Sequence, residues 1–141
     1  MNPRIIEQLG GEKILERDIR NDNELMDAIQ QGIPKAAVDY WIKDNNISMG
    51  AISSFLNMNP RTLERRKGKS LQPNEGDALA QLADLFATGK DIFGNKERFL
   101  GWMHTENAAI GYKKPFDLLS SSVGRDSVKN VLGRIDYGVY S

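Results

Sequence analysis

The chain has 141 residues, of which 40% are hydrophobic and 27% charged, a balance typical of a folded globular protein and too apolar for general disorder. It contains no cysteine, which excludes disulfides and thiolate metal sites and favours a cytoplasmic location. No apolar run approaches the roughly 18 residues that a membrane span needs, and Met1 to Glu7 lack the apolar core of a secretory signal.

The net charge is zero, but the charges are unevenly distributed. Residues 61–69 carry five Lys or Arg against one Glu, a net of +4. Residues 1–60 carry six basic against nine acidic residues, a net of −3, and residues 70–141 carry eight against nine, a net of −1. One short cationic segment in a mildly acidic chain suits local contact with phosphates better than general adhesion to polyanions.

Apolar residues recur at helical spacings along the whole chain and the alternation of a strand is absent, so we expect an all-α fold. Gly68 and Pro73 bound a short linker, which predicts an N-terminal region at 1–72 and a C-terminal domain at 73–141. The helices are expected at about residues 4–9, 12–20, 23–31, 34–45, 49–56, 60–67, 74–88, 95–104, 115–119 and 125–137.

The segment from Met49 to Lys69 has the pattern of a helix-turn-helix. Two short helices joined by a tight turn need apolar residues at fixed offsets, and Ile52, Leu56, Met58 and Leu63 occupy them. Asn57 stands at the turn position, where a left-handed conformation is expected. Ser53 and Arg66 depart from the pattern, and Arg66 indicates that the second helix ends early.

The second helix of this pair is predicted to face DNA, because its polar side chains can bond phosphates and base edges in a major groove. The alternative is a solvated basic helix in an ordinary helical bundle. The predicted DNA-binding residues are Asn59, Arg61, Thr62, Arg65, Arg66, Lys67 and Lys69.

From Ile33 onward the chain resembles the Xre/MbcA/ParS antitoxins, in particular the Xre partners of RES-domain toxins. Three stretches carry the resemblance. They are the arginine-rich segment 59–66, the segment 102–119 with its Trp helix, Asn-containing loop, Gly, Pro and Leu-Leu pair, preceded by residues 92–94, and the chain end 132–141. Glu106 and Ala108 stand where prolines are common in the family, and Tyr112 stands in place of a second glycine.

This resemblance implies an N-terminal module that binds operator DNA and represses the operon, and a small helical C-terminal domain that neutralises a RES toxin. RES toxins resemble ADP-ribosyl-transferase-fold proteins and consume NAD, and the family's chain end is thought to obstruct the toxin's active site.

Side chains near the C-terminus are typical of interface anchors, since they combine large area with polar tips. The alternative is a last helix docked on its own core, which we expect for Ile135 and Val139. The predicted toxin-binding residues are Arg134, Asp136, Tyr137, Gly138, Val139, Tyr140 and Ser141.

We expect no enzyme, cofactor, metal site or small-molecule substrate. His104 is the only histidine and is expected on the surface at a helix end, while Trp41 and Trp102 are expected in the core. One short recognition helix reads few bases, so a homodimer is expected. Its candidate interface is the apolar segment Ile5, Ile6, Leu9, Ile14 and Leu15, which can equally cover its own core.

Two other functions remain open from the sequence. One is a stand-alone helix-turn-helix transcriptional regulator or anchoring protein without a toxin partner. The other is a structural helical adaptor that does not bind DNA.

Overall fold

The computed structural model describes residues 2–136, and throughout this range the chain forms helices and loops but no strand. The expected all-α class is therefore confirmed. The fold divides into two compact units, residues 1–84 and residues 85–141. No helix in the described range is both long enough and apolar enough to span a membrane.

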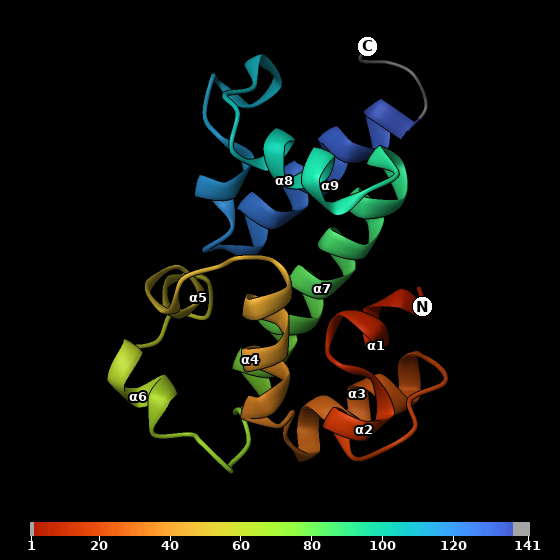
Figure 1. The fold of residues 1–141 in the computed structure, drawn as a ribbon, viewed down its shortest axis with the longest axis vertical. Helices are drawn as coiled ribbons and strands as arrows, with labels where there is room; N and C mark the ends of the chain where they lie inside the picture. Colours follow the sequence, from red (N-terminus) through yellow and green to blue (C-terminus); the bar gives the residue numbers. More distant parts are fainter. Residues whose placement is uncertain (1, 137–141) are drawn as a thin grey trace. The chain divides into compact units, whose positions relative to one another are not determined.

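The first unit contains six short helices and the first part of a longer one (Figure 1). Asparagine and serine side chains start several of them: Asn21 Oδ1 accepts from the backbone N–H of Glu24 at 2.9 Å and so caps α3. The helices are α1 (Arg4–Gln8), α2 (Gly11–Leu15), α3 (Asp22–Gln31), α4 (Lys35–Asp44), α5 (Met49–Phe55), α6 (Pro60–Glu64) and the beginning of α7 (Pro73–Phe93).

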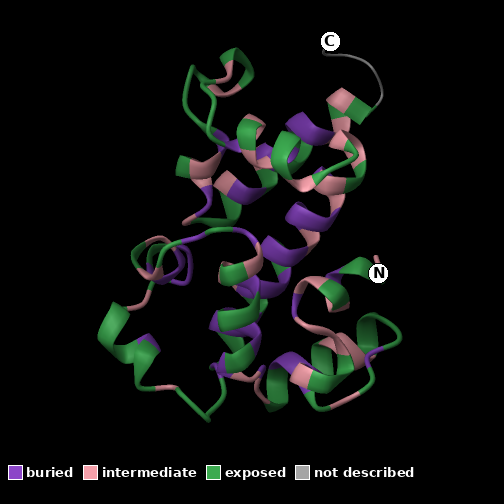
Figure 2. Ribbon diagram, viewed as in Figure 1, coloured by how far each residue is buried: buried purple, intermediate pink, exposed green. Residues whose placement is uncertain are grey.

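The core of this unit forms where the apolar faces of these helices meet, and Trp41 is fully buried in it, as expected. Figure 2 shows buried positions along α4 and α7, whereas α6 is mostly exposed. The apolar N-terminal segment also packs here: Ile5, Leu9 and Leu15 are buried, and Ile6 and Ile14 are half-buried. Most of the surface proposed for pairing two copies is therefore used by the chain's own fold.

The second unit contains the rest of α7, then α8 (Lys96–Met103), the 3-10 turns η1 (Ala108–Ile110) and η2 (Pro115–Leu118), and α9 (Ser122–Asp136). Its aromatic side chains form one cluster. The Phe86 and Phe99 rings meet edge to face with centroids 5.1 Å apart, and Phe93 lies 5.6 Å from Trp102. This cluster fixes α8 against the end of α7.

The sequence interpretation ended α7 at residue 88, before Gly89, but the helix continues to Phe93. A Cβ at position 89 would overlap the ring of Phe99, which is fully buried. Glycine therefore stands here to let an aromatic ring lie directly on the helix backbone, and not to end the helix.

The boundary between the two compact units falls inside α7, after Asp84. The reason is the packing along α7. Its first turns belong to the first unit, since a Cβ on Gly76 would lie 3.2 Å from Ile33. Its last turns belong to the second unit, because Phe86 and Gly89 contact Phe99.

Arg66 lies beyond the end of α6, which stops at Glu64 and not near Lys67 as expected. The Arg66 guanidinium pairs with the Glu75 carboxylate through two contacts, Nη1–Oε1 at 2.6 Å and Nη2–Oε2 at 3.3 Å. Glu75 Oε1 also accepts from the backbone N–H of Gln72 at 2.7 Å. The side chains are only 18% and 8% exposed, so this ion pair is largely buried.

Replacing Gly89 by alanine is expected to lower the free energy of unfolding by about 1–3 kcal/mol, the usual cost of overpacking a core. Gly101→Ala is the matched control, because a Cβ there meets nothing within 4 Å, and it is expected to be neutral or to stabilise by up to about 1 kcal/mol. Urea unfolding followed by circular dichroism measures both. Equal stabilities of the two variants would refute this account of Gly89.

Arg66→Ala is expected to lower the free energy of unfolding by about 1–3 kcal/mol, because the nearly buried Glu75 carboxylate loses its charged partner. Arg65→Ala removes the same charge from an exposed neighbour and is expected to change stability by less than about 0.5 kcal/mol. Thermal unfolding at low and high salt measures the difference. Similar melting temperatures for the two variants would contradict a structural role for Arg66.

Candidate functional site

A pair of short helices, α5 and α6, joined by a tight turn, forms the first candidate site. Ser48 Oγ caps α5 by accepting from the backbone N–H of Ala51 at 3.1 Å. Asn57 adopts a φ of 54°, so the left-handed turn residue expected from the sequence is present. Ser53 is buried and its hydroxyl donates to the Met49 carbonyl at 2.7 Å, which explains how serine is accommodated in the pair.

The second helix of the pair, α6, is anchored by one apolar residue and otherwise exposes polar ones. Leu63 is fully buried. Asn59 Oδ1 accepts from the backbone N–H of Arg61 at 2.9 Å, so Asn59 starts the helix. The exposed side chains of α6 and of the turn after it include Arg61, Thr62, Arg65, Lys67 and Lys69.

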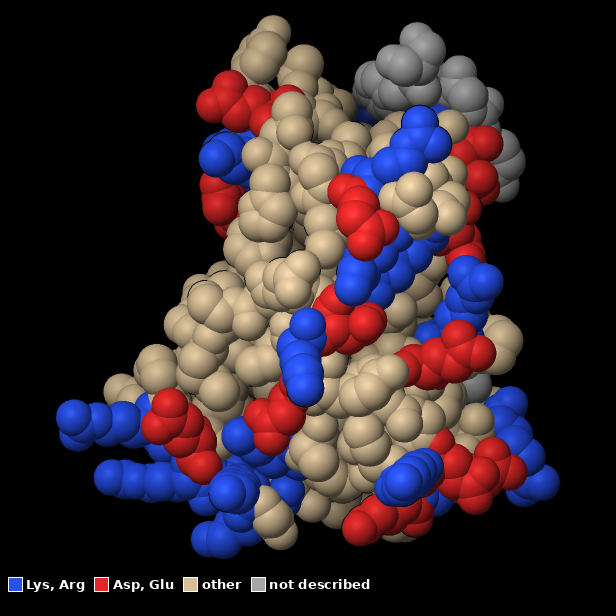
Figure 3. Space-filling view, viewed as in Figure 1, with Lys and Arg blue, Asp and Glu red and all other residues tan. Residues whose placement is uncertain are grey.

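These exposed cations gather over α6, where Figure 3 shows their blue side chains extending outward. Arg66 differs from them, since Glu75 and the Ser70 carbonyl hold its guanidinium. The structure therefore brings together all the residues predicted to face DNA, but gives Arg66 a partner within the unit. Flexible cations beside a threonine hydroxyl can bind phosphate oxygens and base edges.

The end of α9 contains the described part of the second predicted site. Arg134 and Asp136 are exposed in its last turn, whereas Tyr137 to Ser141 lie outside the described residues. Arg134 also lines a cavity of about 150 Å³ beside η1, together with Ala109, Ile110, Ser127, Asn130 and Val131.

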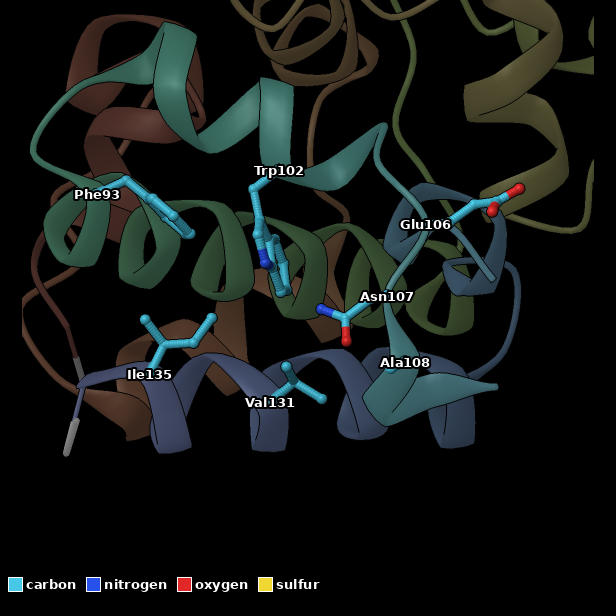
Figure 4. A pocket seen from close by; sticks show the side chains of 7 residues that line it. All are labelled: Phe93, Trp102, Glu106, Asn107, Ala108, Val131 and Ile135. Atoms are coloured by element: carbon cyan, nitrogen blue, oxygen red, sulfur yellow. The ribbon is translucent and has the colours of Figure 1, made fainter. Parts of the chain in front are cut away.

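A larger cavity, of about 330 Å³, lies on the neighbouring side of α9 (Figure 4). Its walls come from the end of α7, from α8, from the loop after α8 and from α9. The lining residues are Phe93, Trp102, Glu106, Asn107, Ala108, Val131 and Ile135. Trp102 is half-buried and forms part of the wall, so its expected place in the closed core is wrong.

The loop after α8 is held in place by Asn107. Its backbone N–H donates to the Lys113 carbonyl at 3.0 Å, its carbonyl accepts from the N–H of Tyr112 at 2.9 Å, and its side-chain oxygen accepts from the N–H of Ala109 at 2.9 Å. Tyr112 has a φ of 62°, which explains why a glycine is common at this position. The Asn107 side chain is thereby fixed at the cavity.

Sequence reasoning missed this cavity, because an apolar helix face looks the same whether it closes a core or lines a hollow. The signal that could have indicated it is the loop itself, since Asn107 and Gly111 are typical of a fixed turn beside the Trp helix. His104 lies where expected, exposed at the end of α8, and its ring packs 4.4 Å from that of Phe116.

Comparison with known proteins assigns the second unit. Residues 88–138 match the family model of the antitoxin Xre/MbcA/ParS C-terminal toxin-binding domain, a range that includes every residue lining the 330 Å³ cavity.

Relatives of this chain are similar over more than the matched domain. A protein of Yersinia enterocolitica serotype O:8 and one of Photorhabdus laumondii subsp. laumondii, each called antitoxin Xre, are both 27% identical to it. The alignments cover 83% and 80% of this chain, and 81% and 78% of the relatives, so the similarity continues into the first unit. The chain is thus similar to the Xre antitoxins over most of its length, and its residues 88–138 match the toxin-binding domain of the Xre/MbcA/ParS antitoxins.

Proposed function

We propose that this chain is the antitoxin of a type II toxin–antitoxin system. In this proposal the second unit binds and neutralises a RES-type toxin that consumes NAD, and the α5–α6 pair represses the antitoxin's own operon. The observation that carries the proposal is the match of residues 88–138 to a toxin-binding domain, together with relatives called antitoxin Xre. The antitoxin acts in the cytoplasm by binding and catalyses no reaction.

Repression rests on the exposed cations of α6. A helix of five residues reads only a few base pairs, so selectivity requires two copies on adjacent half-sites. We therefore propose that a homodimer binds the operator. Since Ile5, Leu9 and Leu15 are buried in their own chain, that dimer uses a surface other than the N-terminal apolar segment.

Neutralisation rests on the end of α9 and the residues after it. Arg134 and Asp136 are exposed beside the chain end, and Tyr137, Val139 and Tyr140 follow with large side chains. In the proposal these residues enter the toxin's active site, while the broader surface of the second unit holds the partner. Co-purification with the product of the adjacent gene tests this assignment. An adjacent open reading frame that does not encode a RES-like protein would instead favour the alternative function, a transcriptional regulator without a toxin partner.

The double substitution Arg61→Ala and Arg65→Ala is expected to weaken operator binding at least about 30-fold, because each lost contact of this kind costs about 1–3 kcal/mol. The free energy of unfolding is expected to stay nearly unchanged, since both side chains are exposed. The control is Lys13→Ala with Lys43→Ala, which removes the same charge from α2 and α4. Fluorescence anisotropy with operator DNA measures both variants. Equal operator affinities would exclude α6 as the reading helix.

Deleting residues 137–141 is expected to weaken neutralisation of the toxin much more than binding to it. The fold and operator binding are expected to remain, because the deleted residues follow the buried positions Val131 and Leu132. The substitution Arg134→Ala is also expected to weaken neutralisation of the toxin. Co-expression with the toxin, followed by growth and cellular NAD, measures neutralisation. If the truncated chain, at matched expression, protects cells from the toxin as well as the full-length chain does, the chain end has no role in neutralisation.

A further inference from the structure

The loop between α8 and α9 holds a tyrosine in a backbone conformation that tyrosine rarely adopts. Tyr112 has a φ of 62°, in the left-handed region, where a Cβ crowds a neighbouring carbonyl oxygen. Glycine takes up the same conformation without this cost. Among the described residues, the other non-glycine residues with a positive φ are Glu16, Asn46 and Asn57. Asparagine tolerates this conformation well, whereas an aromatic residue does not, so Tyr112 needs a separate explanation.

The hydrogen bonds of the loop fix the backbone of Tyr112 in this conformation. The N–H of Tyr112 donates to the Asn107 carbonyl at 2.9 Å, and the N–H of Asn107 donates to the Lys113 carbonyl at 3.0 Å. Gly111 is also left-handed, with a φ of 71°, and its N–H donates to the Ala108 carbonyl at 3.3 Å. The chain therefore reverses at residues 111 and 112, and the tyrosine side chain leaves the loop from a fixed backbone.

The ring of Tyr112 gains no packing within its own unit to offset the cost of this conformation. The residue is 71% exposed, and within the described part of the chain its ring contacts no other ring and its hydroxyl makes no hydrogen bond. Figure 1 shows the loop between α8 and α9 projecting from the helices of its unit. The stability of the chain alone therefore does not account for a tyrosine at this position.

The charges around the loop favour a protein over a polyanion as the partner of this ring. The charged side chains of residues 104–117 are all exposed, and they are Lys113, Lys114, Glu106 and Asp117. They sum to no net charge, whereas residues 61–69 carry a net of +4. A tyrosine held rigidly on such a surface is typical of an interface anchor between proteins, because it offers a large contact area and loses little side-chain freedom on binding.

We propose that Tyr112 is an anchor residue by which the second unit binds its toxin, an inference that rests on the proposed function. The loop lies within residues 88–138, which match a toxin-binding domain. In the complex the ring fills an apolar pocket on the toxin, and the phenol hydroxyl stays at the polar edge of that pocket. The fixed backbone presents the ring in its bound position before the toxin arrives, which lowers the ordering cost of association.

The decisive variant is Tyr112→Gly, because it is expected to make the free chain more stable and the complex weaker. Glycine relieves the backbone strain, so the melting temperature is expected to rise by about 1–4 °C. The affinity for the purified product of the adjacent gene is expected to fall at least about 10-fold, the loss of a strong interface contact. Scanning calorimetry measures the melting temperature, and titration calorimetry measures the affinity.

Glu16→Gly is the matched control for the backbone strain. Glu16 is exposed, belongs to the first unit and has a φ of 60°, so glycine there relieves the same strain outside the toxin-binding domain. This variant is expected to raise the melting temperature by a similar amount and to leave the affinity for the gene product unchanged. Tyr40→Ala is the control for loss of an exposed tyrosine, since Tyr40 lies on α4, and it is also expected to leave that affinity unchanged.

Equal affinities of Tyr112→Gly and the unaltered chain for the gene product would overturn the inference and leave the proposed function standing. A lower melting temperature of Tyr112→Gly would also overturn it, because the ring would then be packed within its own unit. Weaker binding of operator DNA by this variant would assign the loop to nucleic acid instead, and a smaller mass in sedimentation would assign it to a second copy. If the unaltered chain does not bind the gene product, the proposed function fails and the inference falls with it.

Discussion

The contact between the Phe99 ring and the backbone of α7 at Gly89 is the constraint on which the second unit depends. Glycine within a helix costs about 1 kcal/mol relative to alanine, and here that cost permits a close approach that no larger residue allows. Phe99 then contacts Phe86 and Phe93, and Phe93 in turn contacts Trp102. Phe93 and Trp102 form part of the wall of the 330 Å³ cavity. Gly89 thus helps to position this part of the wall.

In the first unit, a polar contact holds neighbouring segments together. The Arg66–Glu75 pair connects the segment after α6 to the first turn of α7, and the Gln72 N–H completes the coordination of the carboxylate. Such a largely buried ion pair keeps its geometry, because leaving either charged group buried without its partner would cost free energy. Together with the buried Leu63, it holds the C-terminal end of the short α6 and leaves the other side chains of the helix exposed.

Local signals made much of this fold predictable. The caps at Ser48, Asn59 and the turn at Asn57 act through their own backbone neighbours, so a reader of the sequence can place them. What could not be predicted depends on residues distant in sequence. Gly89 looks like a helix stop until Phe99 is known to lie on it, and nothing in the sequence indicates that Arg66 pairs with Glu75. The cavity is of the same kind, since its walls come from four separate segments.

The pairing of Arg66 also limits how strongly salt affects any complex with a polyanion. Binding of a cation to a DNA phosphate releases condensed counterions, and each contact contributes about 0.9 to the slope of log affinity against log salt concentration. With Arg66 held by Glu75, the exposed cations of the segment are Arg61, Arg65, Lys67 and Lys69. This segment therefore contributes a slope of at most about 3.6 per copy. In the proposed repressor, the Glu75 carboxylate thereby makes DNA binding by α6 less dependent on the ionic strength of the cell.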